Sequence, residues 1–395
     1  MASSYKTPPF IGPIATNAFS SRGLSGSGVS AETTQYKQTS VDVSRALDQD
    51  SCYIHSHYVL TELLDLFAAR GIDSHKLLRG SKLFYDDIVY SEKMISAEQY
   101  RVILKNAIRL KPGENIALLY GERLLQNPLN PLCRLLDTAD SFTEALASLM
   151  AYQRMLLPLC QLRQYQTGPT LLVYLLDFFH DKPLQRFTME TLLGIIFTLI
   201  RRHPTTAPTE LKGFCDYLAD KNGLAANYSE DLQRSNTPKY IATQFFHSPI
   251  TNGIALSGGS VVAPEQTATN DSAQMISTIE CRRHSQSASG RPHMIDLLYQ
   301  QVLSSGKHNS LNQSAEAFGM SPATLKRRLK SQGYSFQQLL DLCRFHRVMY
   351  LLHHDQLNTQ QLAEALGFHD ARSFRRAFKR STGALPRDFV QHWLI

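Results

Sequence analysis

Residues 363–367 read Ala-Glu-Ala-Leu-Gly, and residues 315–319, 48 positions earlier in the chain, read Ala-Glu-Ala-Phe-Gly. A repeat at this separation indicates two copies of one supersecondary unit. In each copy, the alanine that opens the stretch allows two helices to approach closely, and the glycine that closes it supplies the positive φ of a tight turn. The repeat therefore predicts two helix-turn-helix units.

The residues that precede each copy predict where its first helix begins. Ser310 with Gln313, and Asn358 with Gln361, both have the spacing of a capping box, in which two side chains satisfy the free backbone N–H groups of a helix start. Ser321 followed by Pro322 predicts the start of the second helix in the first copy. Asp370 takes the same capping place in the second copy.

Each second helix is predicted to have an apolar inner face and a basic outer face. The inner positions are Leu325 and Leu329 in one copy and Phe374 and Phe378 in the other. The outer positions are Lys326, Arg327 and Lys330 in one copy and Arg372, Arg375, Arg376 and Lys379 in the other. Such a face fits the DNA major groove, with phosphates at its rim and guanine O6 and N7 at its floor. A solvated helical hairpin is the alternative, and the second copy in register argues against it.

Residues 336–352 predict one amphipathic helix between the copies. Its length of about 26 Å would hold two recognition helices roughly one DNA turn, or about 34 Å, apart. From His293 onward the chain has thirteen basic and seven acidic residues, so most of the net charge of +7 lies there. A basic small part beside a nearly neutral large part suggests a polyanionic partner for the small part.

The segment from Leu311 to Val390 resembles the DNA-binding domain of the AraC/XylS family of transcription regulators. The resemblance rests on Ala363-x-x-x-Gly367-Phe368, on Ser373-Phe374-x-Arg376-x-Phe378-Lys379, and on Gly383-x-x-Pro386-x-x-Phe389. It implies base contacts from Ala323, Lys326 and Arg327 in the first unit and from Arg372, Ser373 and Arg376 in the second, with Arg375 nearby. Ala323 offers only contact with a thymine methyl group. Ser314 departs from the family, which has an aliphatic core residue there.

The part of the chain before these units is predicted to be α+β, mostly helical with a small sheet. Expected helices are residues 96–110, 116–125, 142–155, 189–201, 211–220 and 271–283, and expected strands are residues 170–179, 240–246 and 253–256. The domain prediction is a disordered leader over residues 1–50, an effector-sensing and dimerisation domain over 51–284, a linker over 285–292 and an all-α DNA-binding domain over 293–395. The whole chain is therefore expected to be mainly α.

Residues 58–256 more loosely resemble the N-terminal domain called arabinose-binding-like in some of these regulators. The resemblance rests on Gly71-Ile72-Asp73, on residues 120–124 and on residues 141–146. It implies that this domain binds a small-molecule effector, whose identity and contacts remain unknown, and forms a homodimer. It also implies an activator that binds double-stranded promoter DNA and works with RNA polymerase.

Other classes of function find little support. The chain has no G-x-S-x-G, P-loop or H-E-x-x-H motif, so we expect no catalytic residue and no enzyme. His55 and His57 resemble a metal pair without further ligands, so we expect no metal and no cofactor. The scattered cysteines and the absence of a signal peptide or a membrane-spanning stretch predict a cytoplasmic, nucleoid-associated protein without membrane contact. The alternatives are a metabolite-processing enzyme or scaffold tethered to DNA, and a regulator without an effector.

Overall fold

The computed structural model of this chain describes residues 46–215, 242–259, 272–304, 310–354, 358–382 and 385–386, except for the single positions 92, 112, 114, 168, 249, 288 and 289. Most of the predicted leader lies outside the described residues. Leu47, which the sequence analysis assigns to the leader, is buried and forms a parallel bridge with His293. The folded part of the chain therefore begins earlier than predicted.

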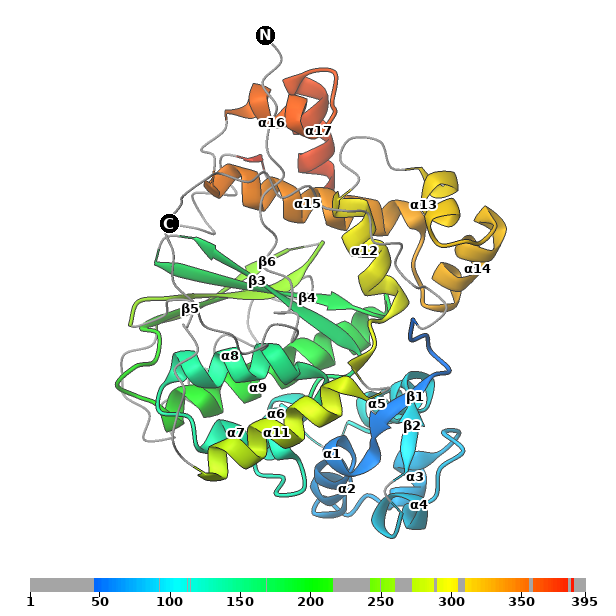
Figure 1. The fold of residues 1–395 in the computed structure, drawn as a ribbon, viewed down its shortest axis with the longest axis vertical. Coiled ribbons are helices and arrows are strands. Elements are labelled where there is room, and N and C mark those ends of the chain that lie inside the picture. The colour runs from blue at the N-terminus through cyan, green and yellow to red at the C-terminus, as the bar shows by residue number, and fades with distance from the viewer. Residues whose placement is uncertain are drawn as a thin grey trace, which may run out of the picture.

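A five-stranded sheet lies at the centre of the molecule, between two layers of helices (Figure 1). Its strands are β3 (Cys160–Thr167), β4 (Thr170–Asp177), β5 (Glu210–Cys215), β6 (Ala242–His247) and β7 (Asn252–Ser257). They lie in the order β3-β4-β7-β5-β6, and only β5 and β6 are parallel. A separate two-stranded ribbon joins β1 (Cys52–His55) to β2 (Met94–Ser96).

The alternating side chains of β4 pack against different helical layers. Leu171, Val173 and Leu175 join the large core that the N-terminal helices share. Leu172 and Tyr174 join a second core formed with the last helices of the chain. Successive side chains of a strand point to opposite faces, and a strand buried on both faces is apolar throughout. This explains the dense apolar run that predicts a buried strand here, and that prediction is confirmed.

The helices form three groups. Those before the sheet are α1 (Ser56–Val59), α2 (Thr61–Ala68), α3 (Ser74–Leu78), α4 (Tyr85–Val89), α5 (Ala97–Leu110), α6 (Ile116–Leu124), α7 (Pro131–Asp137) and α8 (Phe142–Tyr152). Those that follow β4 and β7 are α9 (Lys182–Arg202) and α11 (Ser272–Gln286). The last group is α12 (Met294–Ser304), α13 (Leu311–Ala317), α14 (Pro322–Ser331), α15 (Phe336–His354), α16 (Thr359–Ala365) and α17 (Ala371–Thr382).

These elements confirm the predicted fold class, a mainly α chain with a small sheet in its N-terminal part and an all-α C-terminal part. The helices predicted from their apolar periodicity are present as α5, α6, α8, α9, α11 and α15. Figure 1 shows α8 and α9 on one side of the sheet and α15 on the other. Among the helices that the structure describes, none has both the length and the apolar content to cross a bilayer.

The helix predicted over residues 211–220 is wrong where the chain is described. Residues 210–215 form strand β5, which pairs with β7 on one side and β6 on the other. A short apolar run fits a buried strand as well as a buried helix, and Gly213 within it weakens a helix. Residues 216–220 lie outside the described residues.

Helices α6 and α9 cross at two glycines. A Cβ atom built on Gly121 would lie 2.1 Å from the main-chain oxygen of Thr191, and one on Gly194 would lie 2.1 Å from that of Leu118. Real Cβ atoms do not approach oxygen so closely, so both glycines are required for this contact. The crossing holds α9 against the other N-terminal helices, and α9 in turn supports the sheet.

Candidate nucleic-acid interface

Helices α13 and α14 form the first helix-turn-helix unit. The Ser310 Oγ accepts the backbone N–H of Gln313 at 3.2 Å, and the Gln313 Oε1 accepts that of Ser310 at 3.0 Å. Gly319 in the turn has φ 59°. The Ser321 Oγ accepts the backbone N–H of Thr324 at 3.2 Å and so caps α14. The predicted capping box, turn and second cap are therefore confirmed.

Helices α16 and α17 form the second unit by the same means. The Asn358 Oδ1 accepts the backbone N–H of Gln361 at 3.0 Å, and Gly367 in the turn has φ 77°. The Asp370 Oδ1 accepts the backbone N–H of Ser373 at 2.6 Å. This hydrogen bond stabilises the charged carboxylate and lowers the pKa of Asp370. The two predicted units thus share one local construction.

The apolar pair of each second helix faces the protein interior. Leu325 and Leu329 of α14 are buried, as are Phe374 and Phe378 of α17. The ring of Phe378 stacks at 6.2 Å, centroid to centroid, on that of Phe345 in α15. Helix α15 connects the two units, as the sequence predicts, because its first half joins the core of Leu325 and Leu329 and its second half joins the core of Phe374 and Phe378.

Ser314 shows why a polar residue is tolerated where the family has an aliphatic one. It is fully buried in α13, and its Oγ donates to the Gln301 Oε1 of α12 at 3.0 Å. A buried hydroxyl with a hydrogen-bond partner avoids most of its desolvation cost. The serine at this position therefore does not disrupt the core of the first unit.

The outer faces of α14 and α17 carry exposed side chains at equivalent positions. Counted from the buried pair of each helix, Ala323, Lys326, Arg327 and Lys330 correspond to Arg372, Arg375, Arg376 and Lys379. All eight are exposed, whereas Ser373 is half-buried and engaged with the Asp370 cap. The structure thus brings the predicted residues to the same side of each helix.

The cations on these faces form no ion pair with an acidic residue that the structure describes. Within the described ranges, no carboxylate oxygen lies within 4.0 Å of a cationic nitrogen of α14 or α17. The Arg375 Nε donates to the Ala371 main-chain oxygen of its own helix at 3.3 Å. Arg328 and Arg380 are exposed at the flanks of the same faces, although the sequence analysis did not select them as site residues. Each arginine directly follows a selected basic residue in the sequence, and this position could have identified it as part of the site.

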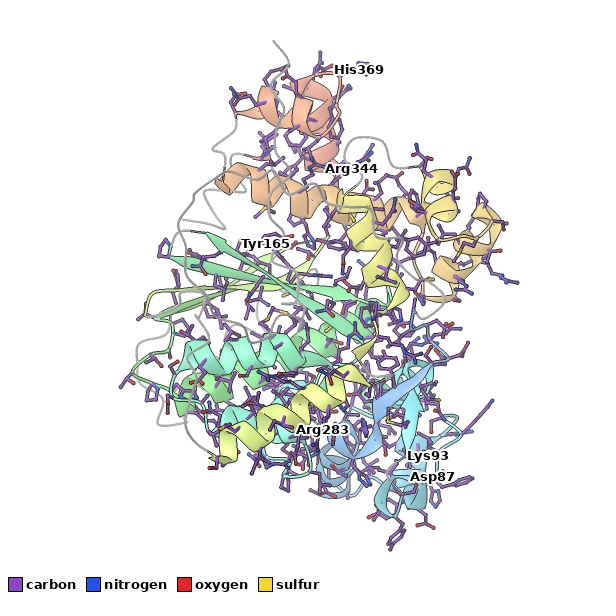
Figure 2. The ribbon with its side chains drawn as sticks, viewed as in Figure 1. Asp87, Lys93, Tyr165, Arg283, Arg344 and His369 are labelled. Atoms are coloured by element: carbon purple, nitrogen blue, oxygen red, sulfur yellow. The ribbon has the colours of Figure 1, made fainter. Side chains whose placement is uncertain are left out.

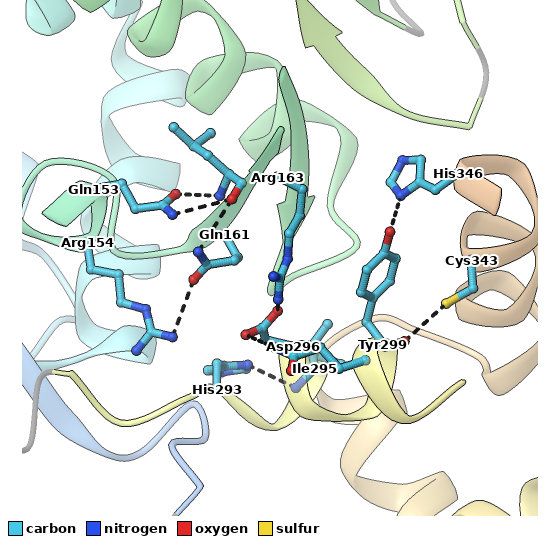
Figure 3. Close-up of polar contacts among 12 residues, drawn as sticks. Gln153, Arg154, Gln161, Arg163, His293, Ile295, Asp296, Tyr299, Cys343 and His346 are labelled. Carbon is cyan, nitrogen blue, oxygen red and sulfur yellow. Dashed lines mark hydrogen bonds and ion pairs between the residues drawn. The ribbon is translucent and has the colours of Figure 1, made fainter. Parts of the chain in front are cut away.

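The C-terminal helices pack directly on the sheet of the N-terminal part. Figure 3 shows the polar contacts across this boundary, where Arg163 of β3 forms an ion pair with Asp296 of α12. Both side chains are almost fully buried. Figure 2 likewise shows Tyr165 of β3 beneath α15. The two predicted domains therefore share a buried interface. The sequence analysis, which predicted a linker over residues 285–292, did not foresee this interface.

His346 of α15 lies at the centre of this interface. Its Nδ1 contacts the Tyr299 hydroxyl at 2.6 Å, and its Nε2 contacts the Thr251 hydroxyl at 3.1 Å. The ring of Tyr174 in β4 packs on the imidazole at 4.7 Å, centroid to centroid. Burial, followed by the charge of Arg163, lowers the pKa of His346 to about 3. The imidazole is therefore neutral at physiological pH. Its contacts join α15 to α12 and to the sheet.

A second contact lies where α14 ends. The backbone N–H of His180 donates to the Gln332 main-chain oxygen at 2.8 Å, and the Tyr334 hydroxyl donates to the Asp177 main-chain oxygen at 2.8 Å. Gln332 and Tyr334 belong to the turn between α14 and α15. The first unit is thus attached to the ends of β4 and α9.

Charged side chains of α9 have structural partners. Arg201 pairs with Glu122, and Arg186 pairs with Glu190 of its own helix. Within the described residues, no group of three or more His, Cys, Asp or Glu side chains is arranged to hold a metal ion. The ring of His55 stacks on that of Tyr58 at 4.7 Å, centroid to centroid.

Comparison with known proteins identifies both parts of the chain. The sequence model of a family described as a helix-turn-helix domain matches residues 314–392. A second, described as the N-terminal arabinose-binding domain of AraC transcription regulators, matches residues 71–211. Together the two matches extend over both of the predicted folded domains.

Individual curated relatives match about a fifth of this chain. The ornithine utilization regulator of Pseudomonas aeruginosa is 39% identical over 84 residues, which are 21% of this chain and 25% of that protein. The regulator RipA of Corynebacterium glutamicum is 42% identical over 82 residues, or 20% of this chain and 24% of that protein. The chain thus spans about a quarter of the length of these curated relatives.

Among solved structures, the transcriptional regulator CdpR from Pseudomonas aeruginosa is similar over 85% of this chain and 98% of its own, with 19% identity and a TM-score of 0.35. The two curated relatives are named as regulators, in agreement with the expectation that this chain is not an enzyme. This chain thus combines two helix-turn-helix units, braced by one helix, with a domain that matches the N-terminal arabinose-binding domain of AraC transcription regulators.

Proposed function

We propose that this chain is a sequence-specific transcription regulator that inserts α14 and α17 into adjacent major grooves of promoter DNA. The proposal rests on one observation above all. Two helices present exposed cationic side chains at matched positions, without ion-pair partners among the described residues, and the inner face of α15 packs in the cores of both. Major-groove recognition needs a helix that is exposed on its outer side and fixed on its inner side.

The proposed roles of the side chains follow from their chemistry. Arg327, Arg372 and Arg376 contact base edges, because an arginine fork matches guanine O6 and N7. Ala323 and Ser373 lie against neighbouring bases, and Lys326, Lys330, Arg375 and Lys379 neutralise phosphates along the groove rim. Arg328 and Arg380 add to the phosphate contacts.

The proposal extends to regulation. The N-terminal domain binds a small-molecule effector and mediates homodimer formation, and the bound regulator activates transcription through RNA polymerase in the cytoplasm. The match to an arabinose-binding-type domain supports a sensor, as does its buried interface with α12 and α15.

Selection of binding sites from a random DNA library by the purified full-length chain tests this function. We expect one enriched motif with two half-sites about one helical turn apart. A matched pair of variants sharpens the test. Arg376→Ala should alter the enriched motif, whereas Arg283→Ala, which removes an exposed arginine of α11, should leave it unchanged. Failure to enrich any motif would contradict sequence-specific recognition.

A further inference from the structure

Large apolar side chains are exposed mainly on two helices, α4 and α11. In the part of the chain that the structure describes, seven of the nine exposed large hydrophobic side chains belong to α11 or to α4 and its two flanking residues. They are Phe84, Tyr85, Val89 and Tyr90 around α4, and Met275, Ile276 and Ile279 on α11. Phe84 and Tyr90 are 70% and 80% exposed, and Ile276 is 57% exposed. Apolar side chains grouped in this way on a surface indicate contact with another molecule.

The outer face of α11 belongs to a helix whose inner face is fixed. Gln274, Ser277 and Cys281 are buried, and the Gln274 Nε2 donates to the Glu144 Oε1 of α8 at 2.7 Å. The outer face repeats at a spacing of three or four residues, which is the spacing of one side of a helix. We call it the α11 patch, and it consists of Met275, Ile276, Ile279 and Arg283. Its side chains are therefore held in place while they remain exposed.

The α4 patch, which consists of Phe84, Tyr85, Asp86, Val89 and Tyr90, lies at the same end of the molecule as the α11 patch. The ring of His284 in α11 packs on that of Tyr58 in α1 at 5.5 Å, centroid to centroid, and α1 also packs on α4. Figure 1 shows both helices far from α16 and α17, and Figure 2 shows Arg283 and Asp87 at this end. A partner bound here would leave α17 free to contact DNA.

The two patches are complementary in chemistry. The α4 patch combines aromatic rings with the carboxylate of Asp86, whereas the α11 patch combines aliphatic and thioether side chains with the guanidinium of Arg283. Asp86 and Arg283 are both exposed, and neither forms an ion pair with a described residue. A guanidinium pairs with a carboxylate and stacks on aromatic rings, and a methionine sulfur packs well at a ring edge. Each patch therefore offers the groups that the other can bind.

We propose that two copies of this chain form a two-fold symmetric dimer in which the α4 patch of each copy packs on the α11 patch of the other. Contact between like patches would place Asp86 opposite Asp86, or Arg283 opposite Arg283, and like charges across an interface are unfavourable. A one-way contact between unlike patches would leave one patch of each kind free and build open assemblies. The reciprocal contact covers all the patches and closes with two copies.

This inference rests on the proposed function, which includes a homodimer, and it assigns the surface through which the dimer forms. Each chain of the dimer keeps its own α14 and α17. Joining two such chains raises the affinity for a pair of binding sites without any new base contact. Loss of the dimer should therefore leave the motif that one chain reads unchanged, which agrees with the expectation for Arg283→Ala.

Sedimentation equilibrium of the full-length chain over a concentration series tests the dimer and its charged contact. We expect the mass of two chains at high concentration. Asp86→Arg and Arg283→Glu should each weaken association at least about tenfold, because each reversal places like charges together in both halves of the interface. An equimolar mixture of the two variants should associate like the parent chain, since every contact then joins opposite charges. A single-chain mass throughout, or no recovery in the mixture, would overturn the proposal.

A matched pair of variants tests the apolar part of the contact. Ile276→Ser should weaken association at least about tenfold, because the isoleucine side chain is buried twice in the symmetric dimer. Leu385→Ser is the control, since Leu385 is an exposed apolar residue outside both patches and should leave association unchanged. Circular dichroism melting curves check that both variants fold. Equal association of the two variants would contradict the assigned surface.

DNA titrations with the same preparations keep the two proposals distinct. A dimer that depends on both patches but binds no DNA would refute the proposed DNA recognition and leave the dimer surface standing. Sequence-specific DNA binding by a chain that stays a monomer would refute the dimer surface and leave the DNA recognition standing.

Discussion

Arg163 of β3 and Asp296 of α12 form an ion pair with side chains only 3% and 4% exposed. The Gln300 Nε2 also donates to the Asp296 carboxylate, at 3.0 Å. The pair joins the sensor sheet to the first helix of the DNA-binding part, because β3 and α12 belong to different predicted domains (Figure 3). A desolvated pair of this kind stabilises one arrangement mainly because neither charge tolerates burial without the other.

Removal of one charge from this pair should therefore be costly. We predict that Asp296→Asn lowers the free energy of unfolding by about 3–5 kcal/mol, because the guanidinium stays buried without this carboxylate. Urea unfolding of the full chain measures the loss. Lys93→Gln breaks a solvent-screened pair with Asp87 and should cost far less than Asp296→Asn. Equal losses in the two variants would show that burial does not control the contribution of the Arg163–Asp296 pair.

The turn of the first unit gives a second prediction. Gly319 has φ 59°, and a Cβ atom there would meet nothing within 4 Å, so the backbone conformation is the only constraint. A β-branched residue strongly disfavours this region, whereas asparagine tolerates it. We expect Gly319→Val to lower the melting temperature and the DNA affinity, and Gly319→Asn to preserve most of both. If the valine variant melts and binds like the parent chain, the turn does not depend on this conformation.

The buried imidazole of His346 makes stability depend on pH. Its pKa is lowered from 6.5 to about 3, so the folded protein resists a proton that the unfolded chain accepts. Stability is thus unaffected above about pH 6.5 and falls as the pH drops from there toward 3, by up to about 1.4 kcal/mol per pH unit. Unfolding titrations between pH 7 and pH 4 should show this decline, with a shallower slope in His346→Gln.

His284 and His293 contribute in the same direction. Burial lowers the pKa of His284 to about 4 and that of His293 well below its usual range. The free energy of unfolding of the His346→Gln variant should therefore still fall with decreasing pH. Its slope should be smaller by at most the contribution of one bound proton, about 1.4 kcal/mol per pH unit. An unchanged slope in this variant would show that His346 is protonated equally in the folded and unfolded chains.

Much of the candidate site could be predicted from sequence because its determinants are local. A capping box, a turn glycine and an apolar pair act within about a dozen residues, and all of them lie where the repeat indicates. The interface with the sheet could not be predicted in this way. Tyr174 and His346 come together only because β4 and α15 meet in three dimensions.

The same reasoning explains the error at β5. Leu211 and Phe214 fit a helix by local periodicity, but their strand partners lie in β6 and β7, later in the chain. The cavity of about 240 Å³ between the sheet and α15 likewise combines residues from β4, β7, α9 and α15. Local pattern thus predicts elements well, whereas contacts between distant elements need the structure.

Equivalent lysines on the two recognition helices should contribute equally to salt dependence. Lys330 and Lys379 are both exposed and occupy matching positions. We predict that the logarithm of the DNA affinity falls steeply with the logarithm of the salt concentration, and that Lys330→Gln and Lys379→Gln each reduce the slope by about 1. Affinity measured over a salt series checks this. A flat dependence in the parent chain would contradict insertion of two cationic helices into DNA.

Base recognition by Arg376 makes the most specific prediction. Arg376 is exposed on α17. The inner side chains of α17, Phe374 and Phe378, are fixed by packing on α15. Its fork can therefore contact guanine O6 and N7 at one base pair of the half-site. We expect Arg376→Ala to lose about 1–3 kcal/mol on the selected site and to stop discriminating at that base pair alone.

Arg327 occupies the equivalent position of α14, so Arg327→Ala should relax discrimination at a base pair about one helical turn away. Affinities for the selected site and for each single-base substitution of it measure both effects. Because α14 and α17 are held by the same helix, the two relaxed positions should lie in different half-sites. If Arg376→Ala instead weakens binding to every DNA sequence equally, its guanidinium contacts phosphate and another side chain of α17 reads the base.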